Sequence, residues 1–152
     1  MYILKDQEKL LAPIYDAPSG QTCGIFYRRP KPSECIAYQS SLLKRKGDKI
    51  QDNTFKTRLE FGLKIITGLR EGDYGIENGD RAVPISSDPS SPDFREDWKE
   101  LIARIAHLHV VAVAALAFEG VAARGKTGVE FEQETGEGAD DIIPFGKSSE
   151  SS

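Results

Sequence analysis

The stretch Trp98–Phe118, WKELIARIAHLHVVAVAALAF, decides the expected fold because it is the longest apolar pattern in the chain. Its apolar residues recur every three or four positions, which predicts an α-helix. Upstream, Ser91 suits a helix cap and Pro92 suits a first helical turn. After Val110 both sides of the helix carry Val or Ala, so this half should be buried more completely. We therefore expect one long core helix over residues 92–119.

Three shorter elements precede this helix. Residues 11–30 are expected to form a β-hairpin, because the turn Pro18-Ser19-Gly20 separates two strand-like runs. Residues 32–46 and 52–68 carry apolar side chains at helical spacing, which predicts two medium helices. Gly47 is expected to end the first of them.

The segment 70–88 is rich in turn residues. The pair Asn78-Gly79 is a strong signal for a tight turn, so the segment should form a loop or a small hairpin. Val83 and Ile85 are expected to face the core. Together with the other elements, this predicts a mainly α protein of the α+β class.

The composition changes from residue 122 onward. Glycines and acidic residues dominate there, and they leave too little apolar surface to offset the entropy of the chain. We expect residues 1–121 to form a single folded domain and residues 122–152 to form a flexible acidic tail. The short apolar patch at 142–145 interrupts this tail.

Charge and cysteine content narrow the function classes. A net charge of −4 gives no general attraction to phosphate backbones, so a nucleic acid partner is disfavoured. Cys23 and Cys35 cannot build a disulfide framework or a metal knuckle. The run Val110–Phe118 is too short to span a bilayer, and the N-terminus lacks the apolar core of a signal peptide. We expect a cytoplasmic protein with no membrane partner.

Residues 120–127, GVAARGKT, match the P-loop pattern of nucleotide-binding proteins. A working P-loop needs a buried strand before it and a helix after it. The preceding run continues the helical spacing from Trp98, and the following residues show no helical period. We expect Gly120 or Gly125 to end the last helix instead, and we expect no cofactor.

The sequence also contains few candidate catalytic residues or metal ligands. His107 and His109 diverge on a helix, so they cannot hold one metal ion together. No serine or cysteine lies on an obvious nucleophile elbow. The acids around 88–97 are explained by the preference of carboxylates for helix N-termini. We expect no enzymatic activity, no catalytic residues and no metal site.

Two short basic runs and several aromatic residues are better suited to protein binding. Arg28-Arg29 and Lys44-Arg45-Lys46 would lie close together if the first helix folded back on the hairpin. Aromatic side chains are frequent anchors in protein interfaces. On that basis the candidate docking residues are Phe26, Tyr27, Tyr38, Tyr74 and Trp98.

The order of elements resembles that of a known protein family. The first half consists of a strand ending IFYRRP (25–30), a helix opening PSE (32–34) and a second helix running into ITGLR (66–70). A turn-rich loop and a last helix ending AFEG (117–120) follow. This pattern, over roughly residues 21–120, resembles the small tail assembly chaperones of long-tailed bacteriophages and prophages. Lys31 departs from the pattern, since a Thr or Ser cap is common at that position in the family.

The resemblance implies a non-enzymatic role in the bacterial host cell. Such a chaperone binds and solubilises the tape measure protein while the tail is assembled. The tail tube protein is a second candidate partner, and self-association stays open. Two alternatives also stay open: a nucleotide-binding domain built on residues 120–127, and another virion component such as a connector or tail terminator.

Overall fold

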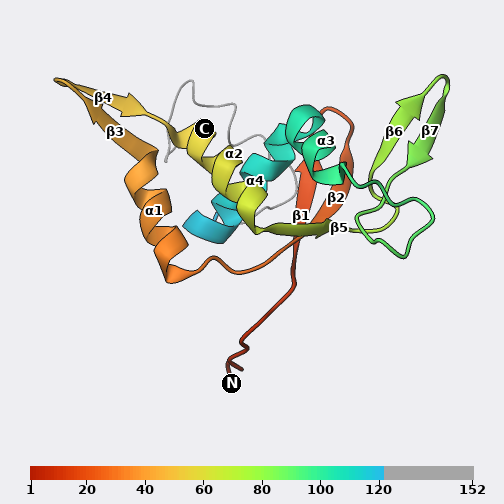
Figure 1. Ribbon diagram of the computed structural model, residues 1–152, viewed down its shortest axis with the longest axis horizontal. Coiled ribbons are helices and arrows are strands. Elements are labelled where there is room, and N and C mark those ends of the chain that lie inside the picture. The colour runs from red at the N-terminus through yellow and green to blue at the C-terminus, as the bar shows by residue number, and fades with distance from the viewer. Residues whose placement is uncertain (122–152) are drawn as a thin grey trace.

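The computed structural model describes residues 1–121 and places a three-stranded sheet beside a small bundle of helices (Figure 1). In chain order the elements are β1 (Leu10–Asp16), β2 (Gln21–Tyr27), α1 (Pro32–Leu42), β3 (Leu43–Lys46), β4 (Lys49–Asp52), α2 (Thr54–Ile65), β5 (Ile66–Leu69), β6 (Gly75–Asn78), β7 (Arg81–Pro84), α3 (Trp98–Ile105) and α4 (His107–Glu119). Over the described residues, four helices and seven strands in three antiparallel sheets define an α+β fold. The prediction of a mainly α protein is wrong.

The predicted N-terminal hairpin is confirmed. Strands β1 and β2 pair antiparallel from Leu10↔Tyr27 to Asp16↔Gln21. The predicted turn lies between them, and Gly20 has a φ of 74°, which glycine adopts without steric cost. Strand β5 pairs with the other edge of β2 and gives the order β1-β2-β5.

Strand β5 corrects the prediction of a helix over 52–68. Helix α2 ends at Ile65, and Ile66 and Leu69 in β5 are almost fully buried. The apolar spacing of this run fits both a helix and a strand. Pairing with β2 satisfies backbone groups that would otherwise be buried without partners, so tertiary context decides the outcome.

The predicted helix over 32–46 is also too long. Helix α1 ends at Leu42, and residues 43–52 form the antiparallel hairpin β3–β4. Gly47, expected to end a helix, lies in the hairpin turn with a φ of 66°. Figure 1 shows this hairpin projecting from one end of the molecule, beyond α1.

The single helix predicted over 92–119 is two helices, bent by 96° where they meet at Ala106. The first begins at Trp98, because the backbone of residues 93–95 hydrogen-bonds to Ser86 and cannot join a helix. Helix α3 has a charged outer face, whereas α4 is buried from His109 to Ala115. The bend lets α4 enter the core while α3 stays at the surface.

Helix α4 forms the centre of the core (Figure 1). It packs against α2 and β1, and its Val110 and Val113 are fully buried together with Ile14, Ile25 and Ile65. Gly62 in α2 allows this close packing. A Cβ built on Gly62 would lie 2.7 Å from the carbonyl oxygen of Val110, which is closer than Cβ atoms approach other heavy atoms in real proteins.

The turn-rich segment forms the second small hairpin, β6–β7, in which Asn78 pairs with Arg81. Gly79 in its turn has a φ of 71°, as the Asn-Gly signal predicts. Ile85 is buried as expected, but Val83 is 37% exposed, so that part of the prediction is wrong.

The expected end of the last helix at Gly120 is confirmed. Gly120 is left-handed, and the amides of Gly120 and Val121 donate to the carbonyl groups of Leu116 and Ala115. The predicted acidic tail, residues 122–152, lies outside the described residues, as does the P-loop-like string from residue 122 onward.

Candidate protein-binding surface

The structure does not bring the five candidate docking aromatics together on one surface. Tyr38 is fully buried: its ring stacks on Phe118 at 4.3 Å and meets Phe61 edge-on. Its hydroxyl donates to Glu119, and burial and then this carboxylate raise the pKa of the Tyr38 phenol. A docking role for Tyr38 stays a prediction, and its burial disfavours it.

An ion pair completes the cluster around Tyr38. The Arg58 guanidinium in α2 holds Glu119 through Nε–Oε2 at 2.9 Å and Nη2–Oε1 at 2.6 Å. The side chain of Arg58 is only 7% exposed. A bidentate pair of this kind fixes geometry as well as charge. It joins the end of α4 to α1 and α2.

Tyr74 belongs to a second buried polar chain. Its hydroxyl lies 2.8 Å from Nδ1 of His109, whose Nε2 lies 3.1 Å from Oδ1 of Asp16. In the neutral ring, Nε2–H donates to the carboxylate and the phenol donates to Nδ1. These hydrogen bonds therefore connect the β1–β2 turn and the loop before β6 to α4.

A pocket of about 480 Å³ opens beside this polar chain. Its polar wall includes Asp16, Cys23, Tyr74 and His109, and its apolar wall comes from α3 and the start of α4. Burial, and then the charge of Asp73, raise the pKa of the Cys23 thiol, which keeps it out of the nucleophilic thiolate form. The arrangement is suited to clamping elements together rather than to nucleophilic chemistry.

The other three aromatics are half-buried and lie apart from Tyr38. Phe26 lies under the ammonium group of Lys9, which is 4.4 Å from the ring centre. Burial raises the pKa of Tyr27. Trp98 starts α3 and packs against the core cluster. Their docking roles stay predictions.

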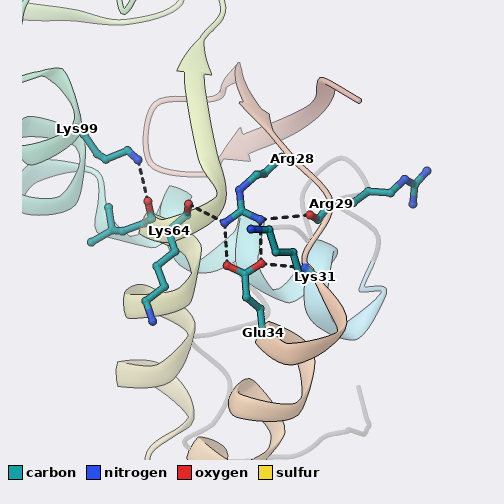
Figure 2. Close-up of polar contacts among 7 residues, drawn as sticks. Arg28, Arg29, Lys31, Glu34, Lys64 and Lys99 are labelled. Carbon is teal, nitrogen blue, oxygen red and sulfur yellow. Dashed lines mark hydrogen bonds and ion pairs between the residues drawn. The ribbon is translucent and has the colours of Figure 1, made fainter. Parts of the chain in front are cut away.

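The first basic run, Arg28-Arg29, is engaged within the fold, and Figure 2 shows the contacts of Arg28. The guanidinium of Arg28 binds both carboxylate oxygens of Glu34, at 2.8 and 2.7 Å. It also donates to the backbone carbonyl groups of Arg29 and Lys64. Arg29 pairs with Glu8 at 2.6 Å.

Glu34 also explains how α1 begins without a side-chain cap at Lys31. The backbone amide of Lys31 donates to Oε1 of Glu34 at 2.8 Å (Figure 2), and a lysine side chain has no acceptor to complete a capping box. The Arg28 contact lowers the pKa of Glu34 to about 2. We call Arg28, Lys31 and Glu34 the Glu34 clip, because together they hold β2 against α1.

The second basic run lies on the projecting hairpin, which we call the arm (residues 43–52). The two runs are at opposite ends of α1, so the expected adjacency is wrong. All eight strand residues of the arm are exposed. A two-stranded hairpin without packing is marginally stable in water, so an arm of this kind is suited to gaining stability from a partner.

The register of the arm separates it into two chemically different faces. Directly paired residues share a face, so Leu43, Arg45, Ile50 and Asp52 lie on one side. Lys44, Lys46, Lys49 and Gln51 lie on the other side, which we call the lysine face. Leu43 and Ile50 are diagonal neighbours, and they are 60% and 65% exposed.

Other large apolar side chains are exposed on the two helices that flank the arm. Ile36 on α1 and Phe55 at the start of α2 are exposed as well. The root of the arm is fixed, because the amide of Asn53 donates to the carbonyl of Leu42. We call Ile36, Leu43, Ile50 and Phe55 the apolar strip. The spacing analysis missed it because part of the arm was assigned to a helix.

Residues 1–121 offer neither a metal-binding cluster nor a single membrane-spanning helix. No group of three or more His, Cys, Asp or Glu side chains in this range could hold a metal ion. No single helix in this range is long and apolar enough to cross a bilayer. Only the bent pair α3 and α4 meets that length and composition when taken together.

A scan against protein-family models, a search of curated proteins and a search of solved structures each find no match to this chain.

Proposed function

We propose that this protein is a non-enzymatic tail assembly chaperone of a long-tailed phage or prophage, which binds and solubilises the tape measure protein in the bacterial cytoplasm. The tail tube protein is a second candidate client. The proposal starts from the order strand, helix, helix, loop, helix over residues 21–120, to which the structure adds short strands.

The apolar strip is the observation that carries the proposal. Its four large apolar side chains are exposed on a projecting arm and on the two helices beside it. We infer that these four side chains act together as one binding surface, because clustered exposed apolar residues mark binding sites for proteins with apolar surfaces of their own. A helix-rich client with apolar stripes would supply a matching surface.

The nucleotide-binding alternative loses one of its requirements. The element before residues 120–127 is helix α4, whereas a P-loop follows a buried strand. Titration of the full chain with ATP or GTP and magnesium tests this alternative. Saturable binding that Lys126→Ala abolishes would establish the nucleotide site and overturn the chaperone proposal.

A connector or tail terminator is favoured by a different observation. Components of this kind usually need more strands than the sequence predicts, and seven strands are present over residues 1–121. Binding of the chain to assembled phage heads or finished tails, with no effect on the tape measure protein, would support this second candidate.

Co-expression with the tape measure protein from the same locus tests the chaperone proposal. We expect the client to stay soluble and to elute with this chain on size exclusion. In the double variant Leu43→Thr and Ile50→Thr, threonine keeps strand propensity but removes apolar surface. The double variant should lose about 3 kcal/mol of the free energy gained when the two side chains are buried against the client, which weakens binding about a hundredfold.

Val83→Thr is the matched control, because Val83 is an exposed apolar residue on the other hairpin, β6–β7. It should leave client binding unchanged. A client that stays insoluble with the unmodified chain would refute the chaperone proposal. Equal binding by the double variant and the unmodified chain would refute the role of the apolar strip.

A further inference from the structure

The lysine face of the arm carries charge that the fold does not neutralise. Lys44, Lys46 and Lys49 lie together on it, and within residues 1–121 none of them forms an ion pair. Arg28 and Arg29, by contrast, are each held by a carboxylate. The lysine face is therefore a basic surface that is open to an acidic ligand.

We propose that residues 130–141 of the same chain bind the lysine face of the arm. This segment, EFEQETGEGADD, carries six carboxylates and no lysine or arginine. Three lysines on one face and a run of acids give direct charge complementarity. The contact is a property of the chain alone and does not depend on the client proposed above.

The sequence after the acidic run matches the other side of the arm. Residues 142–145, IIPF, are apolar and follow directly after Asp141. The arm carries lysines on one face, and on the other face Leu43 and Ile50 lie beside Arg45 and Asp52. An acidic run followed by an apolar one can therefore satisfy both faces by crossing the edge of the arm.

The place where the described chain ends makes the contact geometrically accessible. Glu119 at the end of α4 accepts a hydrogen bond from Tyr38. Tyr38 lies in α1, five residues before the arm begins at Leu43. Five helical residues rise about 8 Å, and a four-residue strand adds about 13 Å. The ten residues from Val121 to Glu130, joined by nine Cα–Cα steps, span up to about 30 Å when extended. The acidic segment can reach its own arm without a second copy.

Zero-length carbodiimide cross-linking of the full chain tests the contact, because it joins an amine to a carboxylate only when they touch. We expect most links from residues 130–141 to fall on Lys44, Lys46 and Lys49, and fewer on Lys5 or Lys9. Raising NaCl from about 0.05 to about 0.5 M should reduce their yield several-fold by screening. An equal mixture of ¹⁵N-labelled and unlabelled chains should give links within one chain.

A variant with all six carboxylates of residues 130–141 changed to amides provides the second readout. In amide NMR spectra of the full chain, this variant should shift signals of Lys44–Gln51 and leave those of β1 unchanged. The triple change Lys5→Gln, Lys9→Gln and Lys31→Gln is the control and should preserve the arm links. Links spread evenly over all lysines, links mainly between chains, or unchanged arm signals would each overturn the proposal.

Discussion

The Glu34 clip makes a prediction that can be worked out from its geometry. Changing Glu34→Gln keeps the shape of the side chain but removes the charge that holds Arg28. A pKa of about 2 in place of 4.5 corresponds to roughly 3 kcal/mol of stabilisation if all of it reached the folded state. The Arg28 side chain is 34% exposed, so solvent screening should reduce the loss to about 1–2 kcal/mol.

The same geometry fixes how the loss depends on pH. The pKa of Glu34 is lower in the folded state than in the unfolded chain, so its contribution is complete above about pH 5 and declines as pH falls toward 2. By about pH 3 more than half of the contribution should be gone. The difference in unfolding free energy between the unmodified chain and Glu34→Gln should therefore shrink over this range.

Urea unfolding followed by circular dichroism at several pH values measures this difference. At pH 7 the variant should also melt about 5 °C lower. Glu77→Gln is the control, because Glu77 is an exposed carboxylate on β6 and forms no ion pair within residues 1–121. A Glu34→Gln loss that is the same at pH 7 and pH 3, or no loss at pH 7, would refute the electrostatic reasoning.

Three further substitutions test the packing of α4. Gly62→Ala should destabilise the fold by about 1–3 kcal/mol in urea unfolding, because the new Cβ would collide with the carbonyl of Val110. Alanine favours helices, so a variant more stable than the unmodified chain would contradict this expectation. Tyr74→Phe removes the hydrogen bond to His109 and should cost about 1 kcal/mol in the same assay, with no cost if that bond is not made. Glu119→Ala should cost roughly 3 kcal/mol by breaking the buried ion pair with α2, and a loss below about 0.5 kcal/mol would show that the pair is solvated.

Local signals in the sequence predict the parts of the fold that depend on near neighbours. The turn at Gly20, the turn at Gly79 and the helix end at Gly120 each need a positive φ, and glycine provides it. The burial of Ile85 also follows from local pattern. These features require no knowledge of distant contacts, which is why sequence alone is sufficient for them.

The missed elements depend on contacts far along the chain. Strand β5 forms because β2 offers a free edge some forty residues earlier, and no local property of Ile66–Leu69 distinguishes it from helix. The late start of α3 follows from the backbone bridge between Ser86 and Phe94, and the bend at Ala106 accompanies the burial of α4 from His109 to Ala115. The charged strands of the arm have low strand propensity, so their pairing gives little signal.

The docking residues predicted from aromatic composition differ from the exposed residues that the structure shows on and beside the arm. Aromatic composition favours Tyr38 as an anchor for a partner, but its ring packs inside the core against Phe61 and Phe118. His109 carried a usable signal, because a histidine inside an otherwise apolar run is expected to be buried with a hydrogen-bond partner. Which partner it finds, Asp16, could only come from the structure.

The junction at Glu119 has a mechanical consequence. Tyr38 and Arg58 both hold Glu119, so a pull on the chain beyond Gly120 is first borne by contacts with α1 and α2. Tension applied there acts on these contacts before it can separate α4 from α2 and β1. A force that a bound partner applies through the C-terminal residues therefore acts on the contacts of Glu119 before it can unfold the core helix.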